Sequence, residues 1–425
     1  MNFISYIHNN ILIMDGAMGT MLQKQGIEGG KCLELLNVES PDMVSSVHRA
    51  YRDLGSKMIQ TNTFGANRIK LSKFGLGDRV RELNQAGVGI AREVMGSDGW
   101  VALSVGPTGE LFEPYGSLKW DGAYSAFKEQ ITIGAKAGCD VIWIETMSDL
   151  EEARTAIIAA KENCHLPVVC TMTFESSKTT LMGNTPATCI STLQGVGADA
   201  VGVNCSGGPR QLIDVVREMH PYAKVPLVMQ PNAGLPKMMG GQMVYSLSPE
   251  EMADFIPEIL EAGVRIIGGC CGTQPEHIGA MTRRLSDNPV AGYVARDGRK
   301  VISSSRRAVV LEGDWQNRVA EMVIDLGSLL SGTYEPEKIS AGKDIILLRL
   351  VNMPDGVDDK QMAATVVNFV KTRLTYPIII DAGNQHSLLA LVLRYYPGIA
   401  PVRTLVPVPS DHIGTYNRYG SFSLF

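Results

Sequence analysis

The sequence predicts an α/β protein: a (β/α)8 TIM barrel in residues 1–290, followed by a smaller α/β domain that is a partial barrel. Eight short apolar runs alternate with amphipathic stretches through the first three quarters of the chain, which is typical of parallel strands covered by helices. Eight strand–helix pairs within about 290 residues match one such barrel. Polar and thiol side chains gather at the C-terminal ends of the runs. A closed barrel brings those ends around one mouth, whereas the alternative, an open doubly wound sheet, would spread them along an edge.

The elements follow one another in a regular order. The predicted strands are 11–16, 57–64, 101–107, 141–146, 167–174, 200–206, 226–234 and 265–273. Several of the helical segments between them begin with Asp or Ser and end with Gly, as helix caps prefer. These segments are 42–55, 78–95, 121–138, 149–162, 210–219 and 248–263. The polar and thiol residues at the strand ends are Asp15, Asn62, Glu145, Asn204, Cys205, Asn232, Cys270 and Cys271.

The last third of the chain has a different pattern. Residues 291–308 are polar and predict a linker, and residues 309–425 predict the smaller α/β domain. Its expected strands are 343–351 and 376–384, and its expected helices are 315–332, 358–374 and 385–398.

Composition and charge exclude several classes of function. The formal net charge of −5 argues against nucleic acid or an anionic membrane as the main partner. No run of about 20 apolar residues predicts a membrane span. The N-terminus lacks the basic start and the cleavage site of a signal peptide, so we expect a cytoplasmic protein. In that compartment the eight cysteines are not expected to form a disulfide framework.

Three cysteines stand at strand ends and predict a metal site. Cys205 ends the sixth strand, and Cys270 with Cys271 ends the eighth within a glycine-rich segment that allows the backbone to leave strand geometry. Three thiolates suit Zn²⁺, and the fourth position that they leave open is typical of catalytic zinc. The alternatives are three small buried side chains or a vicinal redox pair. The other cysteines are expected to serve packing: Cys32, Cys139, Cys164, Cys170 and Cys189.

The charge of such a centre indicates its chemistry. Zinc with three thiolates carries a net charge of −1, and a substrate thiol at the open position can lose its proton to the metal. A metal centre this rich in electrons leaves the bound sulfur nucleophilic, which favours alkylation at sulfur over hydrolysis.

Seven motifs resemble the homocysteine S-methyltransferase family, and their order is most similar to the homocysteine-binding module of the cobalamin-dependent methionine synthases. The motifs are DGAMGTML (15–22), QTNTFGANRIKL (60–71), VGPTG (105–109), IETM (144–147), NCSGGP (204–209), PNAGLP (231–236) and GGCCGTQPEHI (268–278). The resemblance covers roughly residues 5–290 and implies the same barrel.

The resemblance also implies roles for single residues. Cys205, Cys270 and Cys271 would bind zinc and act in catalysis, while Asp15 and Glu145 would bind the ammonium group of homocysteine. Backbone N–H groups and small side chains near Gly16, Ala17 and Ser104 would hold its carboxylate. Asn62 and Thr63 would line the pocket. Asn232 is either a resting metal ligand that the thiol displaces or a turn former, and Asp15 has the same alternative of a turn role. Asn67, Arg68 and His277 are taken as structural.

The resemblance implies a zinc-dependent methyltransferase that converts homocysteine to methionine, a step of methionine biosynthesis. The expected methyl donor is a methyl-corrinoid (cobalamin) on a separate protein. S-methylmethionine and a betaine-like compound are alternative donors. A non-catalytic scaffold subunit of a corrinoid system and a vicinal-thiol redox protein are alternatives of other classes.

The C-terminal domain resembles the early part of a pterin-binding barrel. Residues 376–398 carry this likeness, but the opening signature of that module is absent and about half of its strands are missing. Half a barrel leaves apolar surface and sheet edges open. We expect the tail 401–425, a second copy or another protein to cover them, and this favours a homodimer over a monomer.

Overall fold

The computed structural model describes residues 2–235, 237–239, 242–286, 299–336, 339–403 and 410–424. The chain divides into two compact units. The first contains Met1–Met182 and Ala198–Arg296, and the second contains Gly183–Gly197 and Asp297–Phe425. The domain boundaries given above stay a prediction.

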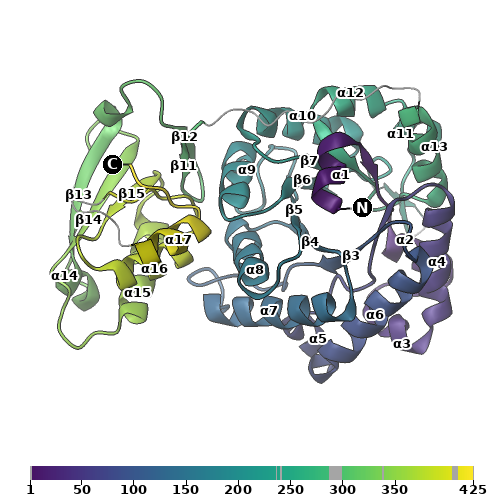
Figure 1. Cartoon of the computed structure of the whole chain (residues 1–425), viewed down its shortest axis with the longest axis horizontal. Coiled ribbons are helices and arrows are strands. Elements are labelled where there is room, and N and C mark those ends of the chain that lie inside the picture. Colours follow the sequence, from purple (N-terminus) through teal and green to yellow (C-terminus); the bar gives the residue numbers. More distant parts are fainter. Residues whose placement is uncertain are drawn as a thin grey trace. The chain divides into compact units, whose positions relative to one another are not determined.

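The first unit is built on eight parallel strands in the order β1-β10-β7-β6-β5-β4-β3-β2. Figure 1 shows β3 to β7 of this set. Their bounds are β1 Leu12–Ile13, β2 Met58–Gln60, β3 Trp100–Val105, β4 Val141–Met147, β5 Val168–Met172, β6 Ala200–Asn204, β7 Leu227–Gln230 and β10 Val264–Ile267. A parallel bridge between Met14 and Met58 joins the two end strands, with the Lys57 N–H donating to the Ile13 carbonyl at 2.8 Å. The predicted (β/α)8 barrel is therefore confirmed, and each of its eight strands lies within a predicted run or within one residue of it.

Helices surround this sheet and fill the connections between strands. Their bounds are α1 Phe3–Asn9, α2 Met18–Lys24, η1 Leu33–Leu35, α3 Leu36–Glu39, α4 Pro41–Asp53, α5 Arg68–Ser72, η2 Gly77–Arg79, α6 Val80–Met95, α7 Trp120–Ala137, α8 Leu150–Asn163, α10 Pro209–Met219, η3 His220–Tyr222, α11 Pro249–Ala253, α12 Ile256–Glu261 and α13 Pro275–Ser286. The helix predicted over 248–263 is divided into α11 and α12. Pro257 lies in the first turn of α12, where the missing N–H of proline is tolerated but a continuous helix is not.

Apolar side chains close one end of the barrel. Phe3 and Ile7 of α1 are buried against the first halves of the strands, and α1 lies over that end of the barrel (Figure 1). The cluster that they join includes Leu12, Met58, Ala102, Val141, Trp143, Val169, Ala200, Val228 and Ile266. The opposite end, where the strands finish, is left for polar side chains.

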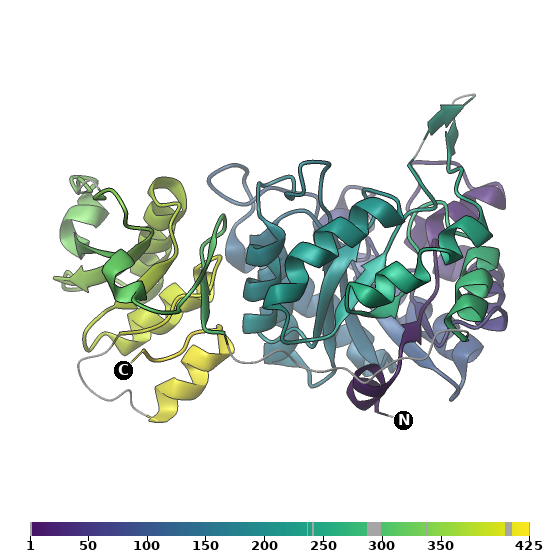
Figure 2. The ribbon, with the colours of Figure 1, turned by 90° about the horizontal axis from the view of Figure 1, so that it is seen from above.

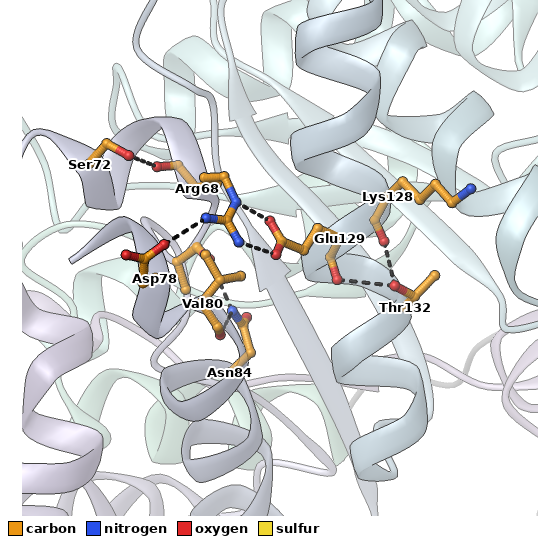
Figure 3. Close-up of polar contacts among 9 residues, drawn as sticks. Arg68, Ser72, Asp78, Val80, Asn84, Lys128, Glu129 and Thr132 are labelled. Atoms are coloured by element: carbon orange, nitrogen blue, oxygen red, sulfur yellow. Dashed lines mark hydrogen bonds and ion pairs between the residues drawn. The ribbon is translucent and has the colours of Figure 1, made fainter.

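Arg68 joins three helical elements on the barrel surface (Figure 3). Its guanidinium donates to both carboxylate oxygens of Glu129 on α7, at 2.8 and 2.5 Å, and to Asp78 of η2 at 3.3 Å. Arg68 lies outside the residues that line the large cavity described below.

A short hairpin of β8 (Lys237–Met239) and β9 (Gln242–Val244) follows β7 and projects away from the barrel (Figure 2). Within the described residues, no helix is long and apolar enough to cross a membrane.

The second unit contains a parallel sheet in the order β13-β14-β15, formed by Val319–Asp325, Ile345–Val351 and Ile378–Asp381. The helix predicted over 315–332 is wrong in its middle, because a strand separates a short 3₁₀ helix at Trp315–Arg318 from an α-helix at Leu326–Ser331. Residues 319–325 form β13, because buried Met322 and Ile324 alternate with exposed neighbours at the period of a strand. The remaining elements of this unit are α9 Pro186–Gly195, β11 Val301–Ser303, β12 Ala308–Val310, η4 Trp315–Arg318, α14 Leu326–Ser331, α15 Asp359–Arg373, α16 His386–Tyr395 and α17 Ser410–Arg418.

The end of the chain covers one face of this sheet. Phe422 and Leu424 pack against buried Leu347 and Ile379, beside the β11–β12 hairpin. The tail is thus one of the covers that the sequence predicted. The hairpin begins within the segment predicted as a linker, and residues 287–298 of that region lie outside the described residues.

Helix α9 belongs to the second unit although β5 precedes it in the chain. The hydroxyls of Thr192 and Ser303 are hydrogen-bonded at 2.8 Å, and the Asn184 amide donates to the Ser305 carbonyl. The side chain of Ile399 packs close to Gly195, where an added Cβ would stand 2.6 Å from its Cδ1.

Candidate metal and substrate site

A cavity of about 450 Å³ opens at the C-terminal ends of the barrel strands. It is lined by residues at or after the C-terminal ends of six different strands, including Asp15, Gln60, Asn62, Ser104, Glu145, Thr146, Cys205, Cys270 and Cys271. β10 ends at Ile267, so the cysteine pair lies in the loop that follows the strand.

Three thiols meet at one point of the cavity wall. The sulfur atoms of Cys205, Cys270 and Cys271 all lie within 4.8 Å of one another, and the Cys205 and Cys271 sulfurs are 3.8 Å apart. Ligands about 2.3 Å from a tetrahedral zinc lie about 3.8 Å from one another, so the cluster fits zinc in both donor type and spacing. The buried Oδ1 of Asn232 has no hydrogen-bond partner among the described residues, and the side chain of Asn232 lies close enough to Cys205 to lower its pKa.

Unusual backbone conformations place the thiols. Cys205 and Ser206 have φ angles of 59° and 57°, in the left-handed region that non-glycine residues seldom adopt. Gly272, directly after the cysteine pair, has a φ of +79°, and a Cβ there would stand 2.2 Å from the Tyr245 ring. The chain therefore leaves strand geometry at both cysteine segments and turns the three sulfurs toward one another.

The thiols of the cluster differ in their pKa values. Hydrogen bonds from the Cys270 and Cys271 thiols lower the pKa of Cys205, and the same contact with Cys205 raises the pKa of Cys270. The other cysteines lie outside this cluster, although Cys32 also lines the cavity. Burial raises the pKa of Cys139 to about 12, and the thiol of Cys32 donates to Glu34 at 3.2 Å.

Two buried carboxyl groups face the same cavity. Asp15 accepts from the Gln60 N–H at 2.8 Å through Oδ2, while its Oδ1 is buried without a partner among the described residues. Glu145 accepts from the Ser104 hydroxyl. Burial raises the pKa of Glu145 to about 7, and burial together with Glu145 raises the pKa of Asp15. A cationic group between these two carboxyls would stabilise their charged forms.

The other predicted residues are placed as follows. Gly16 and Ala17 line the cavity, but the Ala17 N–H already donates to the Thr273 hydroxyl at 3.1 Å. Asn62 lines it with its amide tied to Leu33 and Asn37. Thr63 and Asn232 are buried close by and are not lining residues; the Thr63 hydroxyl donates to the Ser104 carbonyl at 2.8 Å.

The prediction missed two glutamines, Gln60 at the end of β2 and Gln230 at the end of β7. The Gln230 amide donates to Gln60 Oε1 at 3.0 Å, and the buried Gln60 Nε2 has no partner among the described residues. Both end their strands, so the rule that located Asp15 and Glu145 would have found them as well.

A lysine that lines the cavity, Lys70, was also missed. The ammonium of Lys70 stands 4.5 Å from the centre of the Phe64 ring, and burial lowers the pKa of Lys70. A lysine on the short helix α5 gave no sequence signal that separates it from surface lysines.

Known proteins share this barrel and its sequence. The family model for homocysteine S-methyltransferase matches residues 12–285. Methionine synthase of Mycobacterium leprae (strain TN) is 30% identical over 331 residues, which cover 73% of this chain and 26% of that protein. Methionine synthase of Mycobacterium tuberculosis (strain ATCC 25618 / H37Rv) is 32% identical over 297 residues, covering 65% and 25%. The chain thus spans about a quarter of the length of these relatives.

Solved structures of the homocysteine methyltransferase MmuM from Escherichia coli share the fold. The metallated form superposes with a TM-score of 0.56 at 24% identity, covering 65% of this chain and 96% of that one. The oxidized form gives the same TM-score at 25% identity, covering 64% and 96%. The family match extends from the first strand of the barrel to its last helix, and the chain belongs to the homocysteine S-methyltransferase family of methyltransferase enzymes.

Proposed function

We propose that this chain transfers a methyl group to the sulfur of homocysteine and forms methionine, with zinc at Cys205, Cys270 and Cys271. The observation that carries the proposal is the meeting of the three thiols and two buried carboxyl groups, Asp15 and Glu145, on one cavity. We further propose that the donor is a methyl-corrinoid on a separate protein, in the cytoplasm. The support for this donor is the resemblance of the motifs to cobalamin-dependent methionine synthases.

The three thiolates would hold the metal and leave one position for a ligand from the cavity. Zinc held by these thiolates would act as a Lewis acid. It would lower the pKa of an incoming thiol, so that the thiol loses its proton at neutral pH. Asn232 lies beside Cys205, and its amide oxygen has no hydrogen-bond partner in the part of the chain that the structure describes, so it is suited to fill the open position when no substrate is present.

The carboxyl groups would select an amino acid thiol. An ammonium between Asp15 and Glu145 places a positive charge beside both carboxyl groups. This charge favours their ionised forms and offsets the effect of burial, which raises their pKa values. The Ser104 hydroxyl keeps Glu145 in place by donating to it. An uncharged thiol would leave two buried carboxyls without a cation and would bind more weakly.

Methyl transfer then needs orientation more than acid–base groups of the chain. The sulfur forms its bond to the methyl carbon while the bond to the donor breaks, and the electron pair stays with the donor. Holding the sulfur in line with that bond can contribute about 7–11 kcal/mol to lowering the barrier.

A donor screen tests the proposed activity. The zinc-loaded full chain is incubated with homocysteine and, in turn, methylcobalamin, S-methylmethionine, betaine, or methyltetrahydrofolate with a corrinoid protein, and methionine is measured. Methionine from methylcobalamin, or from methyltetrahydrofolate only when the corrinoid protein is present, supports the corrinoid donor. Methionine from S-methylmethionine or betaine replaces that donor. No methionine from any donor contradicts the proposal and favours a scaffold role.

Metal analysis tests the site. We expect about one zinc per chain in the wild type, loss of zinc and activity in Cys205→Ala, and neither loss in the control Cys164→Ala, which removes a thiol at the end of α8. A redox role predicts the opposite pattern: chelation leaves activity intact and oxidation abolishes it.

A further inference from the structure

Asn204, the last residue of β6, makes more polar contacts than its place in the fold requires. Its side chain is 1% exposed. Nδ2 donates to the Thr146 hydroxyl at 2.8 Å and to the Cys270 sulfur at 3.8 Å. Oδ1 accepts from the Thr146 N–H at 3.1 Å and from the Thr171 hydroxyl at 3.0 Å. One amide thus contacts β4, β5 and the loop after β10.

The contact between Asn204 and Thr146 lies where the pairing of β4 with β5 is irregular. Ile144 pairs with Cys170 and Met147 pairs with Met172, so β4 advances by three residues while β5 advances by two. The extra residue makes a β-bulge, a feature that re-aims side chains beside active sites. Glu145 and Thr146 occupy this bulge, and both line the cavity.

Thr146 is held in an unfavourable conformation. Its φ is 59°, and a β-branched residue in the left-handed region is strained unless its surroundings hold it there. Asn204 bonds both the N–H and the hydroxyl of Thr146, and these contacts close the bulge from across β5. Without them the bulge would be free to relax and Glu145 to turn away from the cavity.

The contact with Cys270 gives the same amide a second role. Hydrogen bonds from outside a metal site orient its ligands and tune their charge. An N–H donor at the Cys270 sulfur stabilises thiolate charge and fixes the direction of that side chain.

We propose that Asn204 is a positioning residue that couples the ammonium-binding carboxyl group, through the Thr146 bulge, to the thiol cluster, through Cys270. The proposal rests on the proposed function for the identity of the ligand. The bulge and the N–H···S contact can be tested without that ligand.

The test compares variants of the full chain by three measurements: zinc affinity in a chelator competition, homocysteine affinity by calorimetry, and hydrogen exchange of the segment 141–147. For Asn204→Ala we expect zinc affinity to fall by roughly 10- to 100-fold and homocysteine affinity by roughly tenfold. We also expect faster exchange at Thr146, whose N–H would lose its acceptor. The matched control is Thr171→Val, which removes one donor to Oδ1 and leaves both Nδ2 contacts; all values should stay within about threefold of wild type.

A second substitution separates the two roles of Asn204. Glycine at position 146 accepts the left-handed backbone without a partner. In the double variant Asn204→Ala/Thr146→Gly, homocysteine affinity should recover to within about threefold while zinc affinity stays low. Unchanged zinc and homocysteine affinities in Asn204→Ala overturn the proposal, as does a double variant in which homocysteine affinity is not restored.

The role of Asn204 can still be tested if Asn204→Ala does not fold, or if the wild type does not bind homocysteine. If Asn204→Ala does not fold, Asn204→Asp replaces it, because Asp keeps the size and the acceptor oxygens but lacks the N–H donors. In the cobalt-substituted protein its sulfur-to-metal charge-transfer band should shift to longer wavelength while exchange at Thr146 stays slow, and an unshifted band overturns the proposal. If the wild type does not bind homocysteine, the proposed function fails, and zinc affinity with Thr146 exchange still decides the role of Asn204.

Discussion

Glu145 and Glu152 share one electrostatic property and differ in what they contact. Burial raises the pKa of each to about 7. Glu145 lines the cavity, whereas Glu152 on α8 accepts from the backbone N–H and the hydroxyl of Thr108, at 2.7 and 2.6 Å. The pair therefore separates a binding role from the effect of burial alone.

We expect the binding of an amino acid ammonium to depend on pH through Glu145. The pKa in the folded protein is raised, so Glu145 holds a proton below about pH 7 and becomes a carboxylate above it. Affinity should therefore rise as the pH increases through about 7. Homoserine is the probe, because it carries the ammonium and carboxylate without a thiol that would titrate. Glu145→Gln should reduce this rise to the part that Asp15 contributes, and should weaken binding at pH 8 by roughly 10- to 100-fold, the value of a hydrogen bond to a charged group.

Glu152→Gln is the control for that experiment. It should leave the pH dependence of homoserine binding unchanged, since Glu152 lies outside the cavity lining. A homoserine affinity that is flat with pH in the wild type would show that Glu145 does not hold the ammonium.

The free energy of unfolding of the wild type should fall as the pH rises from about 4.5 to 7. The reason is that the folded state binds more protons than the unfolded state at Glu145 and Glu152.

At the scale of elements, the loop after β10 depends on Gly272. An added methyl group would meet both a left-handed backbone and the Tyr245 ring. Gly75 is a matched control, because its φ of +73° is similar and nothing lies within 4 Å of an added Cβ. Gly75→Ala should cost about 1–2 kcal/mol in the free energy of unfolding from backbone strain. Gly272→Ala should cost more and should also lower zinc affinity, as measured by urea unfolding and metal competition.

The Arg68 contacts give a prediction of small size. The guanidinium is about half exposed, so an ion pair with Glu129 should contribute only about 0.2–1 kcal/mol to stability. A double-mutant cycle with Arg68→Ala and Glu129→Ala measures this coupling, which should shrink at high salt. Zinc and homocysteine affinities should not change. A large loss of zinc affinity or of homocysteine affinity would mean that the position of α5 affects the geometry of the cavity.

Element boundaries show where sequence reasoning was sufficient. All eight barrel strands were predicted, because buried parallel strands are short, apolar and spaced by helices. The middle of the helix expected over 315–332 was wrong, because burial of Met322 and Ile324 at every second residue has the period of a strand and not of a helix. Local periodicity fixes an element, but it does not carry the contacts between strands that are distant in sequence.

The site was predictable in part for the same reason. Strand-end positions pointed to Asp15, Glu145 and the three cysteines, and these residues line one cavity, while their roles stay a prediction. The coupling through Asn204 was not predictable, since it requires the bulge in β4 and the register of three neighbouring strands. That thiols 65 residues apart converge likewise depends on the closure of the whole barrel.

For the whole molecule, the assignment of α9 to the second unit predicts that the barrel is not self-sufficient. A chain ending at residue 296 would lose the Thr192–Ser303 and Asn184–Ser305 contacts and the packing of Ile399 at Gly195. We expect such a fragment to have a lower melting temperature than the full chain and to associate, because apolar surface of α9 becomes exposed. Size-exclusion chromatography and thermal unfolding check this. An equally stable, monomeric fragment would contradict it.

The left-handed backbone at Cys205 and Ser206 also limits how this cluster of three thiols could be transplanted. Three cysteines copied onto the matching strand ends of another barrel would follow that barrel's own main-chain path, and their sulfurs would diverge unless the same turns were copied. The unit that must be moved is therefore the turn at Cys205 and Ser206 with its φ angles, together with the segment Cys270–Cys271 and the glycine that follows it. A set of side chains alone would reproduce the composition of the site and not its geometry.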